Sequence, residues 1–183
     1  MIRSLLLVVC LTCPAIAAAQ LAPAPAVAID EGRAAAIARQ LVRIEGEVPA
    51  TWVRGLGAAD RAILFVLAED PARALVVRRR AVLALRHLAE PAVRALLERR
   101  ASDPSEDAIV SRYALRALAL GFGEEAFDAI VARLGDARAH VREGAAEALV
   151  LADPARARAA LEGALAVETS PFVRRTIERL LAG

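Results

Sequence analysis

The sequence contains no lysine, only two cysteines and few aromatic residues, and each shortage narrows the choice of fold and function. Aromatic residues make up 3% of the 183 residues, and most of the 57% hydrophobic content comes from Ala, Leu and Val. A chain poor in Ile, Thr, Tyr and Trp favours helices over strands, because small and straight-chain residues lose the least entropy in a helix. We therefore expect an all-α protein.

Without lysine, all 24 basic residues are arginine, and they nearly balance the 22 acidic residues to leave a formal charge of +2. Proteins that bind nucleic acid usually carry a clear basic excess, and those that bind single strands add stacking aromatic residues. The sequence has neither feature, so we expect no nucleic-acid partner. An arginine-only composition is typical of a GC-rich genome and indicates a bacterial source.

The first 19 residues have the pattern of a secretory signal peptide. Arg3 supplies the positive charge, Leu5 to Leu11 form the apolar region, and the alanines at 17–19 precede Gln20. Small residues at these positions are what signal peptidase requires. Cleavage would release a mature chain into the periplasm or the medium, with no membrane insertion.

Two other interpretations of this segment stay open. Pro14 interrupts the apolar run and so disfavours an uncleaved membrane anchor. Thr12 disfavours lipid attachment at Cys13, because a small residue normally precedes a lipidated cysteine. Since Cys10 and Cys13 are the only cysteines, the mature protein would offer no disulfide, thiolate nucleophile or cysteine metal ligand.

One sequence theme recurs every 31 to 33 residues after a Pro/Ala-rich stretch at 20–29, which we expect to be an extended lead. In its first copy, Val77, Ala81 and Leu85 have the spacing of one helix face. The four copies span 77–85, 110–118, 141–149 and 173–181. A second apolar stretch precedes each copy, so each unit is predicted to be a helical hairpin that must stack on the next.

Residues 59–183 are therefore predicted to form an α-α solenoid of about four to five hairpins. An acidic or hydroxyl residue stands before proline at five places, 70–71, 90–91, 103–104, 153–154 and 170–171, which we expect to be helix starts, most of them with the first residue as N-cap. Residues 30–58 are predicted to form a partial repeat and N-terminal cap, with a helix from Asp30 to Ile44. Trp52 either covers the open apolar end of the stack or acts as a binding anchor.

The run at 134–149 resembles the consensus of HEAT repeats, particularly the short bacterial type also found in phycobilin-lyase-like proteins. It has Asp136 in the turn, then Val141 and Arg142, then an Ala-rich helix that ends in leucine. The resemblance is looser elsewhere, where Ser111 takes the place of the arginine. It implies a curved stack whose second helices line the concave side.

The resemblance covers roughly residues 60–183 and also implies roles for the turn residues. Asp70, Asp103 and Asp136 recur at 33-residue intervals, near Arg78 and Arg142. In the family these residues serve the fold. We therefore expect a ladder of turn caps and ion pairs between neighbouring units.

A candidate surface for a partner follows from the helix period. If Val77 and its counterparts are buried, the residues two and six positions later point to the opposite side. This column contains Arg79, Leu83, Arg112, Arg116, Glu143, Glu147, Arg175 and Arg179. It would suit a protein partner whose acidic segments flank a basic one. Alternatively, it is a solvated helix face on which the two glutamates pair with nearby arginines.

The sequence offers no catalytic or metal constellation. His87 and His140 are the only histidines, and they lie in different units without a metal-binding spacing. We therefore expect no cofactor and a non-catalytic, protein-binding scaffold or adaptor in the cell envelope.

Two alternatives stay open. A bilin lyase-like enzyme is suggested by the resemblance, and bilin binding would show in absorbance. A structural envelope protein could instead self-associate, for example as a homodimer through the open solenoid end near Leu180 to Gly183.

Overall fold

A computed structural model of the protein describes residues 29–183. The predicted signal peptide with its two cysteines, and all but the last residue of the predicted lead, lie outside the described residues. The α-helices in chain order are α1 (Glu31–Arg43), α2 (Ala50–Arg54), α3 (Ala58–Glu69), α4 (Leu75–Leu85), α5 (Pro91–Ser102), α6 (Ala108–Phe122), α7 (Phe127–Val131), α8 (Ala139–Ala152), α9 (Pro154–Val167) and α10 (Pro171–Ala182). Two short 3-10 helices, η1 (Gly123–Ala126) and η2 (Ala132–Gly135), flank α7.

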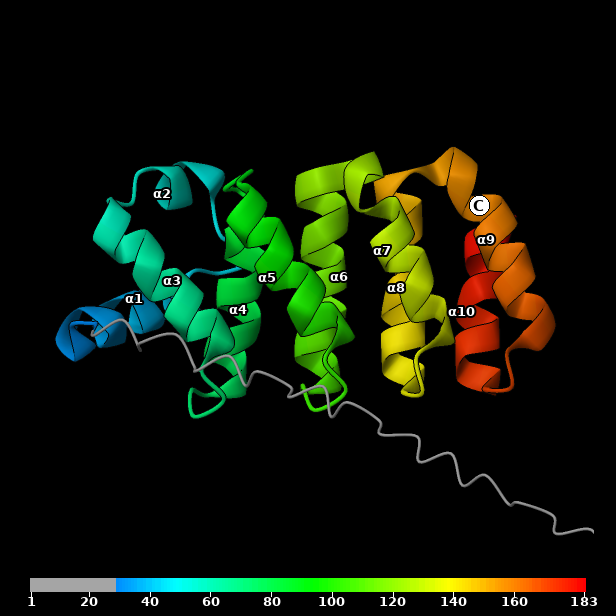
Figure 1. The fold of residues 1–183 in the computed structure, drawn as a ribbon, viewed down its shortest axis with the longest axis horizontal. Helices are drawn as coiled ribbons and strands as arrows, with labels where there is room; N and C mark the ends of the chain where they lie inside the picture. The colour runs from blue at the N-terminus through cyan, green and yellow to red at the C-terminus, as the bar shows by residue number, and fades with distance from the viewer. Residues whose placement is uncertain (1–28) are drawn as a thin grey trace, which may run out of the picture.

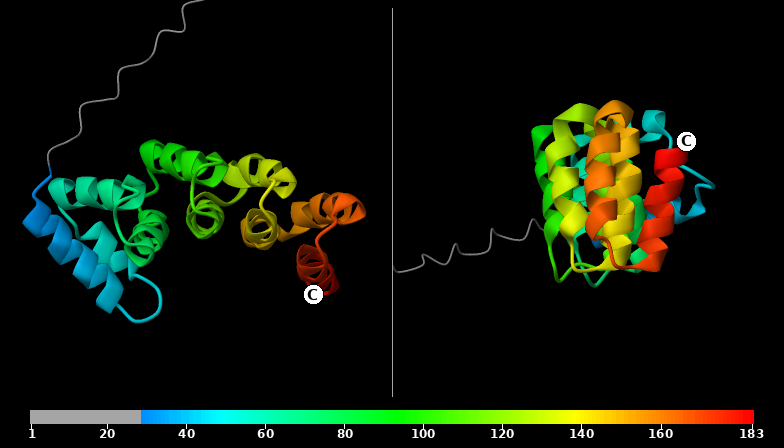
Figure 2. Two further views of the ribbon diagram at one scale, coloured as in Figure 1. Left: turned by 90° about the horizontal axis from the view of Figure 1, so that it is seen from below. Right: turned by 90° about the vertical axis from the view of Figure 1, so that its right-hand side faces the viewer.

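The helices form two curved layers (Figures 1 and 2). The outer layer contains α3, α5, α7 and α9, and the inner layer on the concave side contains α4, α6, α8 and α10. Consecutive inner helices pack against each other, α4 on α6, α6 on α8 and α8 on α10. Each outer helix and the inner helix after it form one hairpin. The predicted all-α solenoid of helical hairpins is confirmed, and the second helix of each hairpin lies on the concave side.

Prolines begin three of the helices, at Pro91 in α5, Pro154 in α9 and Pro171 in α10. An N–H at the first position of a helix has no hydrogen-bond partner within the helix, so proline costs no hydrogen bond there. The Asp153 carboxylate caps α9 by accepting hydrogen bonds from the amides two and three residues later, at 3.0 and 3.1 Å. The other two predicted starts, the aspartate–proline pairs at 70–71 and 103–104, lie in the turns before α4 and α6 and do not begin helices.

The predicted buried stripe is present on all four inner helices, with two members only partly buried, Val77 at the start of α4 and Leu181 at the end of α10. Val110, Val141 and Val173 are fully buried, whereas Val77 is only half-buried. Within residues 29–183, no complete hairpin precedes the hairpin of α3 and α4, and α1 and the short α2 leave the first turn of α4 partly open. The sequence predicts that Val77 is buried, and in the structure it is only partly buried.

The outer helix of the third hairpin is broken into η1, α7 and η2. Gly123 ends α6 with a φ of +50°, a conformation that glycine adopts at little cost. The predicted hairpin implies one continuous first helix before the copy at 141–149, whereas residues 123–135 form three short helices. The hairpin still buries Phe127 and Ile130 in the core.

The two ends of the stack differ in what covers them. At the N-terminal end, α1 starts after Asp30 and ends before Ile44, and Trp52 on α2 is half-buried against the core. At the other end, α10 buries one face and exposes Arg175 and Arg179 among its outer residues. A polar outer face is typical of a terminal repeat that covers a solenoid end.

Arginines of two inner helices pair with glutamates in the turn of the following hairpin. Arg78 Nη2 lies 2.7 Å from the carboxylate of Glu106, and both side chains are buried. Arg142 Nε lies 2.7 Å from the carboxylate of Glu168, which is also buried. These pairs connect the first hairpin to the second and the third hairpin to the fourth.

The predicted aspartates cap their own turns and do not make these connections. The carboxylates of Asp70, Asp103 and Asp136 each accept a hydrogen bond from the amide two residues later, at 2.8 to 2.9 Å. Their ion-pair partners lie within three residues of them. The predicted turn caps are confirmed, but the predicted ion pairs between units are made by glutamates, because each aspartate is turned back toward its own backbone.

Ser111 stands where the HEAT consensus has an arginine. Arg138, in the turn before α8, brings a guanidinium to this position instead. Arg138 Nη1 donates to the Glu106 carbonyl oxygen at 2.8 Å and lies 3.4 Å from Ser111 Oγ. The serine hydroxyl in turn donates to the Arg100 carbonyl oxygen at 3.0 Å. The second and third hairpins are thus connected by a different set of polar contacts.

Small residues let the inner helices approach closely. Ala81, Ala114 and Ala145 are fully buried in the core. A Cβ added at Gly144 would lie 2.5 Å from the Cγ of Arg112 and 3.3 Å from its Cα. Glycine is therefore required where α8 meets α6.

Replacing Gly144 with alanine should lower the free energy of unfolding by about 1–3 kcal/mol, because the new methyl group forces α6 and α8 apart. Gly163 on α9 is the matched control, since a Cβ there meets nothing within 4 Å. Gly163→Ala should raise stability by about 0.5–1 kcal/mol through helix propensity. Urea denaturation measures both, and a stabilised Gly144→Ala variant would contradict the close contact.

The Arg142 hydrogen bond is the main cause that lowers the pKa of Glu168 from about 4.5 to about 2. A carboxyl with a lowered folded-state pKa stabilises the fold fully above its unfolded pKa, and the contribution is lost as the pH falls through the folded pKa. Glu168→Gln should cost on the order of 2–3 kcal/mol at pH 7. The gap to the unmodified protein should close between about pH 4.5 and 2.

The matched control is Glu162→Gln, because Glu162 is exposed and lies 4.0 Å from its arginine. An exposed pair of this kind contributes at most about 0.5 kcal/mol. Acid titration followed by circular dichroism, combined with urea melts at each pH, measures these differences. A Glu168→Gln penalty that does not change with pH would show that the carboxylate charge is not its source.

Candidate functional site

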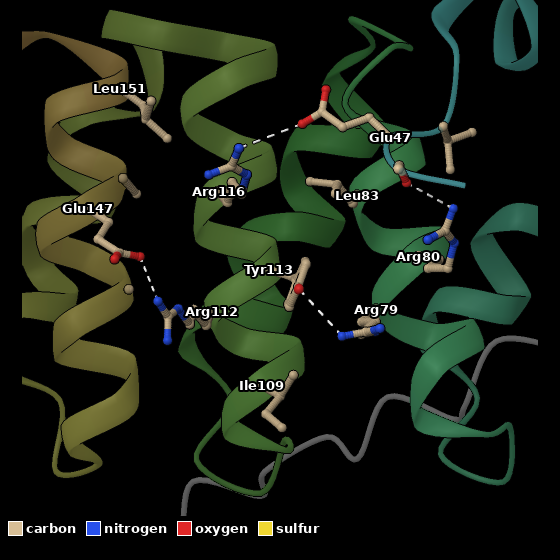
Figure 3. Close-up of a pocket in the computed structure, with 14 residues that line it drawn as sticks. Glu47, Arg79, Arg80, Leu83, Ile109, Arg112, Tyr113, Arg116, Glu147 and Leu151 are labelled. Atoms are coloured by element: carbon tan, nitrogen blue, oxygen red, sulfur yellow. Dashed lines mark hydrogen bonds and ion pairs between the residues drawn. The ribbon is translucent and has the colours of Figure 1, made fainter. Parts of the chain in front are cut away.

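A groove of about 610 Å³ lies on the concave side, between α4, α6, α8 and the loop that joins α1 to α2 (Figure 3). We call it the inner groove. Four arginines, two glutamates, one tyrosine and several aliphatic residues line it. Its volume and its mixture of apolar and charged groups are typical of a binding site.

Of the nine candidate residues predicted from the sequence, five line the inner groove, namely Arg79, Leu83, Arg112, Arg116 and Glu147. The other four lie elsewhere. Glu143 is buried and does not line the groove. Arg175 and Arg179 lie on α10, and Trp52 lies on α2 in the N-terminal cap. Arg179 still reaches toward the groove, with its Nη2 3.8 Å from the Glu147 carboxylate.

Arg112 is neutralised by two glutamates of α8. Its Nη1 lies 2.8 Å from Glu143, and its Nη2 lies 2.7 Å from Glu147. Glu143 is only 5% exposed and also accepts a hydrogen bond from Thr176 at 3.3 Å. The prediction that Glu143 faces the groove was wrong, because α6 and α10 pack on both sides of α8 and cover that position. The predicted alternative, in which both glutamates pair with arginine, describes this part of the surface.

Arg79 contacts an aromatic ring instead of a carboxylate. Its guanidinium carbon lies 5.5 Å from the centre of the Tyr113 ring, and its Nη1 lies 3.4 Å from the tyrosine hydroxyl. A cation over an aromatic face is held in place while its charge stays available to a ligand. Within residues 29–183, no carboxylate lies in ion-pair range of Arg79.

Arg116 and Arg86 share the carboxylate of Glu47. Glu47 lies 2.8 Å from Arg86 Nη2 and 3.6 Å from Arg116 Nη2 (Figure 3 shows the contact with Arg116). The Arg86 hydrogen bond is the largest cause that lowers the pKa of Glu47. The carboxylate is therefore ionised at neutral pH, and it is also 60% exposed.

Polar side chains of α4 and of the residues just after it fix the loop that carries Glu47. Arg80 donates hydrogen bonds to the carbonyl oxygens of Ile44, at 2.6 Å, and Gly46, at 3.1 Å. His87 Nε2 lies 3.0 Å from the Val48 carbonyl oxygen, and burial is the main cause that lowers the pKa of this histidine. We call residues 46–48 the groove strap.

Apolar side chains separate the charged ends of the inner groove. Leu83 and Tyr113 lie between them, and Ile109 and Leu151 are each 43% exposed. Helix periodicity predicted Leu83 but not the other three. The groove strap could not be predicted either, because its position depends on contacts between residues far apart in the sequence.

Two further features of the described residues bear on function. Among residues 29–183, no group of three or more His, Cys, Asp or Glu residues is placed to hold a metal ion. In the same range, no helix is both long and apolar enough to cross a membrane.

The stacked hairpins and their curved inner layer define the class of helical-repeat solenoids. Residues 105–182, which include α6 to α10, match the family model of HEAT repeats. These residues therefore form HEAT repeats, and the helical packing of residues 29–183 is consistent with a HEAT-type solenoid. No curated protein matches the chain. HEAT repeats are commonly protein-interaction scaffolds, and the family is generally non-catalytic.

Proposed function

We propose that this protein is a non-catalytic adaptor of the cell envelope that binds another protein in its inner groove. The observation that carries the proposal is the lining of the groove, where arginines with available charge stand beside exposed aliphatic side chains. Partner surfaces that combine charge complementarity with a few apolar anchors give both orientation and affinity. The setting in the cell envelope rests on the signal-peptide pattern of residues 1–19.

The charge of the groove supports a protein ligand with an acidic surface. Four arginines and two glutamates line it, and Arg112 is already neutralised by its own glutamates. The charge that remains for a ligand is therefore held by separate arginines and is not a continuous basic strip. Nucleic acid binds best to such continuous strips with stacking aromatics, and the groove lining contains a single aromatic residue.

The first experiment places a photo-crosslinking amino acid in the groove of the full-length protein, expressed with its own leader. Ile109 and Leu151 are suitable positions, because each is 43% exposed and lines the groove. Val167 at the end of α9 is the control position, since it is 80% exposed and lies outside the groove. A defined envelope protein crosslinked from both groove positions, and not from Val167, is the expected result.

The second part of the test removes charge. A double variant, Arg79→Ala with Arg116→Ala, should reduce the crosslinked product at least about tenfold, which corresponds to about 1.4 kcal/mol. Its matched control removes two arginines from outer helices, Arg99→Ala with Arg158→Ala, and should leave the product unchanged. Equal losses in the two variants would contradict binding in the groove. Crosslinks only to a second copy would favour the self-associating alternative.

A further inference from the structure

We propose, building on the inner groove as the protein-binding surface, that its occupant is an acidic amphipathic helix of the partner. One carboxylate of this helix contacts Arg79, and a second takes the place of Glu47 at Arg116. The apolar side chains between these carboxylates pack on Leu83 and Tyr113.

The arrangement of the two helices sets the spacing of the ligand. Arg79 and Arg86 stand two turns apart along α4 and its C-terminal end, and Leu83 lies between them. On α6, Ile109 and Arg116 are likewise two turns apart, with Tyr113 between them. Two turns of helix rise about 10 Å. The seam between α4 and α6 therefore presents positive charge at both ends of an apolar middle.

The two ends offer different kinds of carboxylate site. Arg79 is held by Tyr113 and, among the described residues, lies in ion-pair range of no carboxylate. At the other end, Arg86 is 8% exposed, and its buried Nη1 has no hydrogen-bond partner in the described part of the chain. Glu47 supplies the carboxylate at this end from an exposed position on the groove strap.

Glu47 thus acts as an internal substitute for one carboxylate of the ligand. Its side chain is 60% exposed, so it can turn to solvent without moving the groove strap, which is fixed by Arg80 and His87. A ligand carboxylate must compete with Glu47 for Arg116. Removing the charge of Glu47 should therefore strengthen binding, and only for ligands that carry the second carboxylate.

A helix fits this seam better than other acidic ligands. Glutamates two turns apart lie on one face of a helix, and residues midway between them lie on the same face. Such a helix presents two acids with apolar side chains between them, which matches the order of the groove residues. An evenly charged polyanion would set charge against Leu83 and Tyr113.

The probe is a fluorescein-labelled peptide of about 18 residues, long enough to form a helix. It carries two glutamates two turns apart and leucines midway between them. A second peptide of the same composition has the two glutamates one turn apart. A third has glutamine in place of the second glutamate. Fluorescence anisotropy with the mature protein, residues 20–183, measures each dissociation constant.

The two-turn peptide should bind at least about fivefold more tightly than the one-turn peptide. Arg79→Ala and Arg116→Ala should each weaken its binding about tenfold, and Glu47→Gln should strengthen it about threefold. With the glutamine peptide, Arg116→Ala and Glu47→Gln should have little effect. Glu147→Gln, which adds the same charge to the groove, should give a gain that does not depend on the second glutamate.

Equal binding of the two-turn and one-turn peptides would overturn the proposed register. A Glu47→Gln gain that is the same for the glutamine peptide would show a general charge effect and would overturn the competition. If no peptide binds while crosslinking at Ile109 and Leu151 continues, this inference fails and the adaptor function stands. Circular dichroism of each variant verifies that it stays folded.

Discussion

The close contact between consecutive inner helices is the constraint on which the rest of this structure depends. Gly144 permits it between α6 and α8, and fully buried alanines such as Ala81 and Ala114 line the core of the neighbouring hairpins. Because the inner helices approach closely while the outer layer spreads, the stack curves, and the curve forms the groove (Figure 2). The binding surface therefore follows from residues that no partner would touch.

The second constraint is electrostatic and concerns how neighbouring hairpins are held in register. Burying an arginine and a glutamate together is costly unless their geometry is good, and removing one partner leaves an uncompensated charge. Arg78 with Glu106, and Arg142 with Glu168, are pairs of this kind. A planar guanidinium that binds both carboxylate oxygens restricts the angle between two hairpins more than an ammonium group would.

Sequence reasoning recovered the features that depend on neighbours along one helix. The periodic valines, the proline starts and the helix from Asp30 to Ile44 all follow from local rules. Three of the four valines are fully buried, three of the five prolines begin helices, and the helix is present as α1. Five of the eight residues in the predicted binding column also line the groove, because helix geometry alone decides which side those residues face.

The other features of the groove depend on contacts between helices, and the helical periodicity of the sequence does not predict such contacts. Glu143 lies two residues after Val141, as Arg79 lies two residues after Val77, yet α6 and α10 cover Glu143 and leave Arg79 in the groove. Glu47 and the groove strap lie in a stretch without periodicity, so their place on the concave side depends on Arg80 and Arg86. The turn aspartates were recognised correctly as caps, but the longer glutamates that connect the hairpins had no recurring position to reveal them.

The contacts between hairpins are not copies of one another, and this limits how such a chain could have lost or gained repeats. Ser111 is hydrogen-bonded by Arg138, whereas Glu168 forms an ion pair with Arg142. Deleting the third hairpin would bring Ser111 opposite Glu168 and leave a buried carboxylate without its arginine. The hairpins are therefore not interchangeable. One can be lost or gained only when the contact residues of both hairpins that become neighbours change together.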